Sequence, residues 1–329
     1  MSRLAPFGGS DASWDRLIDE LGATSPYTYS GWARFKADDG WSPLRLTDPA
    51  GRCAVQLLVK QTAPGAVVAW APGSPLGDVS ACTTADVLAN LRAARRAVIH
   101  YVRLGATHAS RDTDEQALRA GGWSTVDAPL SSGQSLIVPL QDDEATRLAA
   151  CSSNWSRNLK RGRSRDNLVS VWTSPDPRSI ADLHDELQNF KGAHVVDWRS
   201  QSERITALIQ EFGDRLVVVQ CRDGNGDLHA VRGAIICSGA AFDIIAATSI
   251  EGRRRYSSHV ALWELMNELA RRGVGKFDMG GVDPVRNKGV YDFKHGVGAH
   301  DVRYLGEWDA ASPAILRSLL GRIVSSRVA

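Results

Sequence analysis

Residues 277–294 read FDMGGVDPVRNKGVYDFK, and this stretch lies near the end of an expected second domain. It mixes glycines, a proline and aspartates with Arg286, Lys288 and Lys294, a composition unsuited to an unbroken helix or strand. We expect a strand over 276–279, then a shaped loop, and then a short helical turn that presents Phe293 and Lys294. The alternative is an ordinary surface loop rich in turn residues.

Each half of the chain shows the same order of elements: helices, an antiparallel meander, a helix and a further strand. The meanders are expected at 43–46, 53–60 and 66–70, and again at 216–222, 229–237 and 241–249. The helices that follow them are expected over 85–104 and 258–272. This repeat predicts an α+β fold of two tandem N-acetyltransferase (GNAT)-like domains with a cleft between them.

A chain of 329 residues suits two domains of roughly 150 residues each. We place the first domain at 1–141 and the second at 142–309. The C-terminal segment, 310–329, is a candidate to complete the first domain. The sequence contains no heptad repeat of the kind that would predict a coiled-coil insertion.

The charge balance is nearly even, with 39 basic and 37 acidic residues and a net charge of +2. This composition is not typical of a DNA-coating protein, but it allows a local basic patch. Five scattered cysteines without a CxxC pattern predict neither disulfides nor a metal site. Since neither a signal peptide nor a membrane-spanning run is visible, we expect a cytoplasmic monomer.

The stretch 155–165, WSRNLKRGRSR, predicts a basic helix. Arg157, Lys160, Arg161 and Arg165 fall largely on one helical face, which suits contact with phosphates. Trp155 beside these charges favours RNA, which is bound by stacking as well as by charge. The alternative is a solvated helix face.

A second basic run, 253–256, precedes the helix expected at 258–272 and includes Arg254. In acetyltransferases a Gly-rich loop at this place holds the coenzyme A pyrophosphate on backbone N–H groups. Here Gly252 lies before the arginines, so the sequence argues against coenzyme A, and we expect no cofactor. Motifs of hydrolases, zinc proteases and P-loop enzymes are also missing from the sequence.

Taken together, these stretches resemble the Fem family of aminoacyl-tRNA-dependent peptidyltransferases. The resemblance is carried by WARFKADDGW (32–41), APGSPLG (71–77), SLIVPL (135–140), NWSRNLKRGR (154–163) and, above all, residues 252–308 with their DMGG and VYDFK segments. It implies a fold that binds no coenzyme A. It also implies aminoacyl-tRNA as the donor and a peptide-bearing amine as the acceptor.

The resemblance further implies roles for individual residues. Phe293 and Lys294 match a Phe-Lys pair that acts at the tRNA 3′ end and the reacting carbonyl. Lys36, with Trp32 beside it, matches the position that binds the acceptor's diphosphate, and Arg199 or Lys191 is the candidate for a second acceptor contact. Arg157, Lys160, Arg161 and Arg254 are then the expected tRNA contacts.

The acceptor remains open between two classes. Peptidoglycan-building relatives show tyrosines on a strand where this chain reads AFDIIAATS (241–249). A peptidyl-nucleoside or peptide intermediate of antibiotic biosynthesis is therefore an alternative to a peptidoglycan precursor. Two other functions also stay open: an acyl-CoA-dependent N-acyltransferase and a non-catalytic RNA-binding protein.

Overall fold

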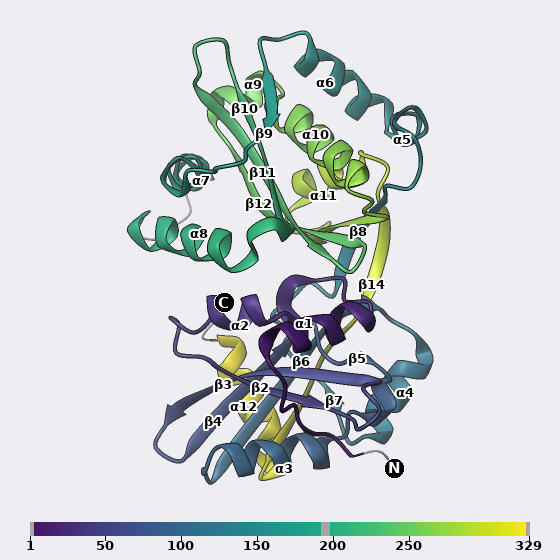
Figure 1. Ribbon diagram of the computed structural model, residues 1–329, viewed down its shortest axis with the longest axis vertical. Helices are drawn as coiled ribbons and strands as arrows, with labels where there is room; N and C mark the ends of the chain where they lie inside the picture. Colours follow the sequence, from purple (N-terminus) through teal and green to yellow (C-terminus); the bar gives the residue numbers. More distant parts are fainter. Residues whose placement is uncertain (1–2, 192–197, 327–329) are drawn as a thin grey trace. The chain divides into compact units, whose positions relative to one another are not determined.

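The structure is a computed structural model that describes residues 3–191 and 198–326 (Figure 1). It contains two compact units, Met1–Ser135 with Val302–Ala329, and Leu136–Asp301. The first unit thus ends six residues before the expected boundary at 141, and the chain returns to it at 302 rather than 310. The cause is strand β14 (His300–Ser312), which pairs with β6 (Ile99–Ala109) of the first unit from Tyr304 onward.

The first unit is a mixed sheet with strand order β1-β2-β3-β4-β6-β14, to which β5 and β7 add short pairings. Strands β4 and β6 run parallel, as expected for strands joined by a helix, whereas β2, β3 and β4 form an antiparallel meander. The remaining elements are β1 (Ala5–Pro6), α1 (Asp11–Glu20), α2 (Ser30–Phe35), β2 (Ser42–Thr47), β3 (Cys53–Ala63), β4 (Ala66–Pro72), β5 (Leu76–Gly77), α3 (Thr84–Ala94), α4 (Asp112–Ala120), β7 (Ser124–Thr125) and α12 (Arg317–Ser326).

The expected single helix over 85–104 is wrong. Helix α3 ends at Ala94, and β6 begins at Ile99. Val98 fits the helical spacing but is 79% exposed, whereas Tyr101 and Val102, on opposite faces of β6, are both fully buried. A strand buried on both faces is apolar without alternation, so its residues continued the apolar pattern of the helix before it.

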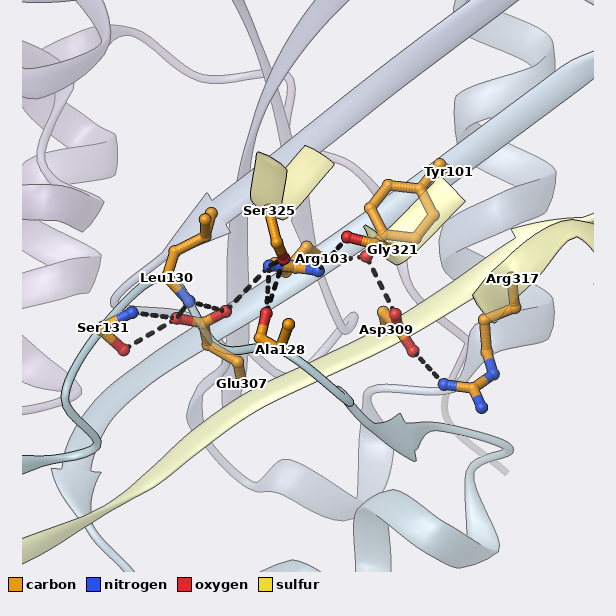
Figure 2. A network of polar contacts seen from close by, with 10 residues as sticks. All are labelled: Tyr101, Arg103, Ala128, Leu130, Ser131, Glu307, Asp309, Arg317, Gly321 and Ser325. Atoms are coloured by element: carbon orange, nitrogen blue, oxygen red, sulfur yellow. Dashed lines mark hydrogen bonds and ion pairs between the residues drawn. The ribbon is translucent and has the colours of Figure 1, made fainter. Parts of the chain in front are cut away.

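Helix α12 is fixed to the sheet of the first unit by a buried polar network (Figure 2). Arg103 on β6 forms an ion pair with Glu307 at 3.2 Å and donates a hydrogen bond to the Gly321 carbonyl at 3.2 Å. Asp309 on β14 accepts a hydrogen bond from Arg317 at 2.6 Å. Because buried charges are tolerated only when paired, this network ties the C-terminal segment to a unit formed mainly by the N-terminal part of the chain.

The second unit has the strand order β8-β13-β12-β11-β10-β9. Helices α6 and α10 lie on one face of this sheet, and α7 and α8 lie on the other (Figure 1). Its elements are β8 (Gln134–Pro139), α5 (Glu144–Ala150), α6 (Ser153–Arg163), β9 (Leu168–Val171), α7 (Pro177–Lys191), α8 (Trp198–Phe212), β10 (Leu216–Arg222), β11 (Leu228–Cys237), β12 (Ala240–Thr248), α9 (Ile250–Arg254), α10 (Ser257–Arg271), β13 (Lys276–Gly281) and α11 (Lys288–His295).

In both units, therefore, an antiparallel meander is followed by a helix and then by a strand that pairs in parallel with the last strand of the meander. In the second unit the apolar stripe of α10, which includes Leu262, Leu265 and Leu269, packs into the core against the sheet. The prediction of two tandem GNAT-like domains is confirmed. Among residues 3–191 and 198–326, no helix combines the length and the apolar character needed to cross a membrane.

Candidate functional site

An opening in the sheet of the second unit creates the candidate site. Strands β12 and β13 pair in parallel over only three residues, and the last pair is Phe242 with Asp278. In the first unit, by contrast, β4 and β6 stay paired over seven residues as far as Pro72 and Gly105. The pairing of β12 with β13 ends at Phe242, and residues of β12 beyond this point line the pocket described next.

A pocket of about 680 Å³ lies at this opening. Its walls come from β11, β12, α9, the first turn of α10 and α11. The residues among them include Arg232, Asp243, His259, Phe293 and Lys294, and Arg253 and Tyr256 also line the pocket. All of these residues belong to the second unit, so the pocket is complete within that unit.

A β-bulge brings Asp243 into this wall. The register between β11 and β12 shifts by one residue, so that Gly233 faces Ile245 but Ala234 faces Asp243. Successive residues of a regular strand point to opposite faces, and Asp243 and Ala246 would then lie on different sides. Because the bulge inserts one extra residue, both side chains line the pocket.

Arg232 and Asp243 form a buried charge pair. The guanidinium Nη2 lies 3.7 Å from the Asp243 Oδ2, and each side chain is only 6% exposed. Burial raises the pKa of Asp243, although the charges of Arg232 and Lys294 oppose this. Within the described part of the chain, Arg232 Nε, Arg232 Nη2 and Asp243 Oδ1 are buried without a hydrogen-bond partner. Such atoms cost free energy, and a polar ligand in the pocket would satisfy them.

Lys294 is positioned by the helix that follows the opening. Its Nζ donates a hydrogen bond to the Met279 carbonyl on β13. Burial lowers the pKa of Lys294, while Asp243 counteracts part of this effect. The result is a half-buried ammonium group at the pocket wall.

Phe293 lines the same pocket and belongs to an aromatic cluster. Its ring lies 4.9 Å from His259 in an edge-to-face arrangement and 6.3 Å from Trp155, and the Arg232 guanidinium lies 5.7 Å from its centroid. Burial and Arg232 lower the pKa of His259 to about 4, so this imidazole is neutral near pH 7. A neutral ring beside Arg232 avoids a second positive charge in the cluster.

Trp155 is a core residue, which corrects its expected role as a stacking platform for RNA. It is 2% exposed and packs against Trp263 at 5.7 Å. On the opposite side of α6, Arg157, Lys160 and Arg161 are all exposed. The basic face predicted for this helix is therefore exposed, but Trp155 is not part of it.

The first half of the basic run 253–256 lies in a helix. Ile250–Arg254 form helix α9, capped by the Ser249 side chain, which accepts from the Gly252 N–H at 2.8 Å. A side chain at Gly252 would lie 2.3 Å from the His229 carbonyl, so this glycine serves the packing of α9 on β11. Arg254 is 74% exposed and pairs with Glu251 of the same helix at 3.4 Å.

Of the expected acceptor residues, Lys36 and Trp32 belong to the first unit, and Arg199 and Lys191 belong to the second. Lys36 lies at the end of α2, where its ammonium group pairs with Asp39. Trp32 is 8% exposed and packs against Tyr27 at 4.7 Å. Arg199 lies in α8, and its side chain, like that of Lys191, is outside the described residues.

Sequence reasoning missed Arg232, Asp243 and His259. Arg232 and Asp243 interrupt strands that are otherwise apolar, AVRGAII and AFDIIAA. Since charged residues are rarely buried unless they are paired, that interruption was a usable signal. The register that joins the two residues was not visible, because it depends on the bulge.

Residues 149–295 match the family model described as an acetyltransferase (GNAT) domain. This range covers most of the second unit and includes every wall of the pocket. A comparison with curated protein sequences found no match.

Among solved structures, FemX aligns over 98% of this chain and 100% of its own length, with a TM-score of 0.79 at 16% identity. The chain has the fold of FemX. L-PGS from Bacillus licheniformis follows with a TM-score of 0.58 at 12% identity, over 97% of both chains. A tandem GNAT protein from the clavulanic acid biosynthesis pathway has a TM-score of 0.57 at 12% identity, over 95% of this chain and 99% of its own. The predicted resemblance to the Fem family is confirmed at the level of the fold.

Proposed function

We propose that this protein is an aminoacyltransferase that moves an amino acid from aminoacyl-tRNA to the amine of a peptide-bearing acceptor. One observation carries the proposal. The pocket where β12 and β13 separate is lined by Lys294 and by the buried Arg232–Asp243 pair, in which Arg232 Nε, Arg232 Nη2 and Asp243 Oδ1 have no hydrogen-bond partner within the described part of the chain. Polar groups of this kind suit an ester that carries an amine. The FemX fold and the acetyltransferase domain support a transfer reaction at this place.

The reaction is aminolysis of an ester. The acceptor nitrogen attacks the carbonyl carbon, a C–N bond forms, and the C–O bond to the tRNA ribose breaks. The proton lost by the amine is balanced by the proton gained by the departing ribose oxygen. Because the ester is already activated, the protein needs only to hold the substrates in register and to stabilise the oxyanion.

Lys294 is the residue to which we assign oxyanion stabilisation. Its ammonium group is half-buried at the pocket wall, where the surroundings strengthen its interaction with a negative oxygen. Phe293 lines the same wall and offers an apolar surface to the terminal nucleotide. Its ring is held by His259 and Arg232, so its position is fixed before the substrate arrives.

The remaining tRNA contacts are assigned to the exposed basic residues of α6, with Arg254 on α9. Arg157, Lys160 and Arg161 lie one helical turn apart or closer, a spacing that suits a phosphate backbone. We assign acceptor binding to Lys36 and Trp32 of the first unit and to Arg199 on α8 of the second. We place the reaction in the cytoplasm, where charged tRNA is available.

The second candidate is an acyl-CoA-dependent N-acyltransferase, which the acetyltransferase domain match favours. One experiment separates the candidates. The protein is incubated with pools of charged tRNA or with acetyl-CoA, together with peptide amines from cell-wall precursors and peptidyl nucleosides. Amide products are then identified by mass spectrometry.

The expected result is a product that appears with charged tRNA and disappears when the tRNA is first digested with ribonuclease. Product from acetyl-CoA alone would replace the proposal by the acyl-CoA reaction. Binding of charged and uncharged tRNA with equal affinity and no product would indicate a non-catalytic RNA-binding protein.

A further inference from the structure

We propose that Arg232 and Asp243 form a subsite for the free α-amino group of the donor, so that the protein accepts aminoacyl esters and rejects N-acylated ones. This inference rests on the proposed function and deepens it by naming the chemical group that is recognised. Asp243 binds the α-ammonium group of the transferred amino acid. Arg232 donates to the oxygen atoms of its ester.

The position of Asp243 supports this assignment. Asp243 directly follows Phe242, the last residue of β12 that is paired with β13. It therefore lies at the point where the two strands separate, while Arg253 and Tyr256 border the pocket beyond the other end of β12. A ligand along this opening would place its acyl end near Asp243 and its nucleotide end near α9 and the start of α10.

The unpartnered atoms indicate which groups fit. Asp243 Oδ1 needs a donor, and Arg232 Nε and Nη2 need acceptors. An α-amino ester supplies both, because its ammonium group donates and its carbonyl oxygen accepts. An acetyl group of coenzyme A lacks the ammonium group and would leave Asp243 Oδ1 without a donor.

The charges of the wall lead to the same conclusion. Asp243 is the only acidic residue among the described residues that line the pocket, where Arg232, Arg253 and Lys294 are basic. Phosphates of the nucleotide are attracted by Arg253, and the oxyanion is attracted by Lys294. A cation in the ligand is left with Asp243 as its counter-ion, and its binding favours the ionised carboxylate.

The test uses RNA microhelices that end in 3′-amide-linked alanine, glycine or serine, with the α-amine either free or acetylated. The amide linkage resists hydrolysis, so binding is measured without an acceptor. The wild-type protein is expected to bind the free amine at least ~10-fold more tightly, the scale of one charged hydrogen bond. Asp243→Asn is expected to abolish this preference and to retain binding of the acetylated microhelix.

Asp292→Asn is the matched control, because it removes a carboxylate from α11 that is exposed and pairs with Lys288 outside the pocket wall. It is expected to keep the preference. If Asp243→Asn does not fold, the double variant Arg232→Met/Asp243→Leu replaces the buried pair by apolar side chains and is expected to lose the preference too.

Three binding results would overturn the inference by itself. Equal affinity of the wild-type protein for both microhelices overturns it, and so does a preference that survives in Asp243→Asn or in the double variant. The proposed function stands in these cases if charged tRNA still yields the ribonuclease-sensitive product. Absence of that product from every charged tRNA overturns the proposed function, and this inference with it.

Discussion

The ammonium group of Lys294 on α11 donates a hydrogen bond to the backbone carbonyl of Met279 on β13. This contact fixes the short helix that follows the turn-rich loop onto the strand that precedes it. It also holds the lysine at the wall of the pocket, beside residues of β11 and β12. The position of the charge is thus set by the same strand that forms one side of the opening.

Replacing Lys294 by methionine is expected to reduce turnover by about 10²-fold, the scale of losing one oxyanion donor. Rates are measured with charged tRNA under single-turnover conditions, and circular dichroism checks the fold. Lys288→Met is the matched control, since Lys288 lies on the same helix but is 74% exposed and pairs with Asp292. Near wild-type transfer by the Lys294 variant would remove this residue from the mechanism.

Reversing the charges of Arg157, Lys160 and Arg161 to glutamate is expected to weaken tRNA binding, most strongly at low salt. Each phosphate contact releases condensed counterions, so losing three contacts lowers the slope of log K against log salt by about 2 to 3. Binding is measured by fluorescence anisotropy at several salt concentrations.

The control for this variant reverses Arg92, Arg95 and Arg96, three exposed arginines at the end of α3 in the first unit. It changes the net charge by the same amount. Equal loss of affinity in both variants would show that net charge, and not the α6 face, governs binding.

Arg103→Met is expected to destabilise the first unit by about 3–5 kcal/mol, because it leaves the buried carboxylate of Glu307 without its ion pair. Urea unfolding followed by tryptophan fluorescence measures the effect. Arg303→Met breaks an ion pair with Glu115 in which the arginine is 76% exposed, and should cost less than about 1 kcal/mol. Similar values for the two variants would contradict the importance of the buried network.

The neutral His259 predicts a specific pH dependence of stability. Its pKa falls from 6.5 in the unfolded chain to about 4 in the fold, chiefly through burial. Between these values only the unfolded chain binds the proton, so stability is lost as the pH falls from 6.5 towards 4. At pH 4.5 this loss amounts to about 2 kcal/mol relative to pH 7.

The measurement compares urea unfolding of the wild-type protein and His259→Leu at both pH values. Whatever packing cost the leucine carries at pH 7, the variant should lose about 2 kcal/mol less on acidification. An identical loss in both proteins would show that His259 is not held neutral by the fold.

Much of the second unit could be predicted from local patterns. The helix expected over 258–272 is α10, Ser257–Arg271, because its apolar residues repeat at helical spacing and Gly273 follows it. The turn-rich stretch 277–294 ends in α11, which brings Phe293 and Lys294 to the pocket wall. In these segments, short-range periodicity and turn chemistry agree with the final fold.

Local patterns failed where burial or register decided the outcome. Trp155 stands among arginines in the sequence, yet the packing of α6 on α10 places it in the core. The segment after Ala94 continued a helical pattern, yet pairing with β4 and β14 made it a strand. Neither result depends on neighbours in the sequence.

Periodicity along the chain was enough to predict the two-fold repeat of elements and the basic face of α6, whereas Phe293 and Lys294 were predicted as site residues from the resemblance to the Fem family. The contact of Arg232 with Asp243 could be recognised only in the folded chain. Their contact requires the bulge between β11 and β12 and the separation of β12 from β13. Strand register is set by the packing of a whole sheet, so the residues that we assign to amine recognition became visible only in the folded chain.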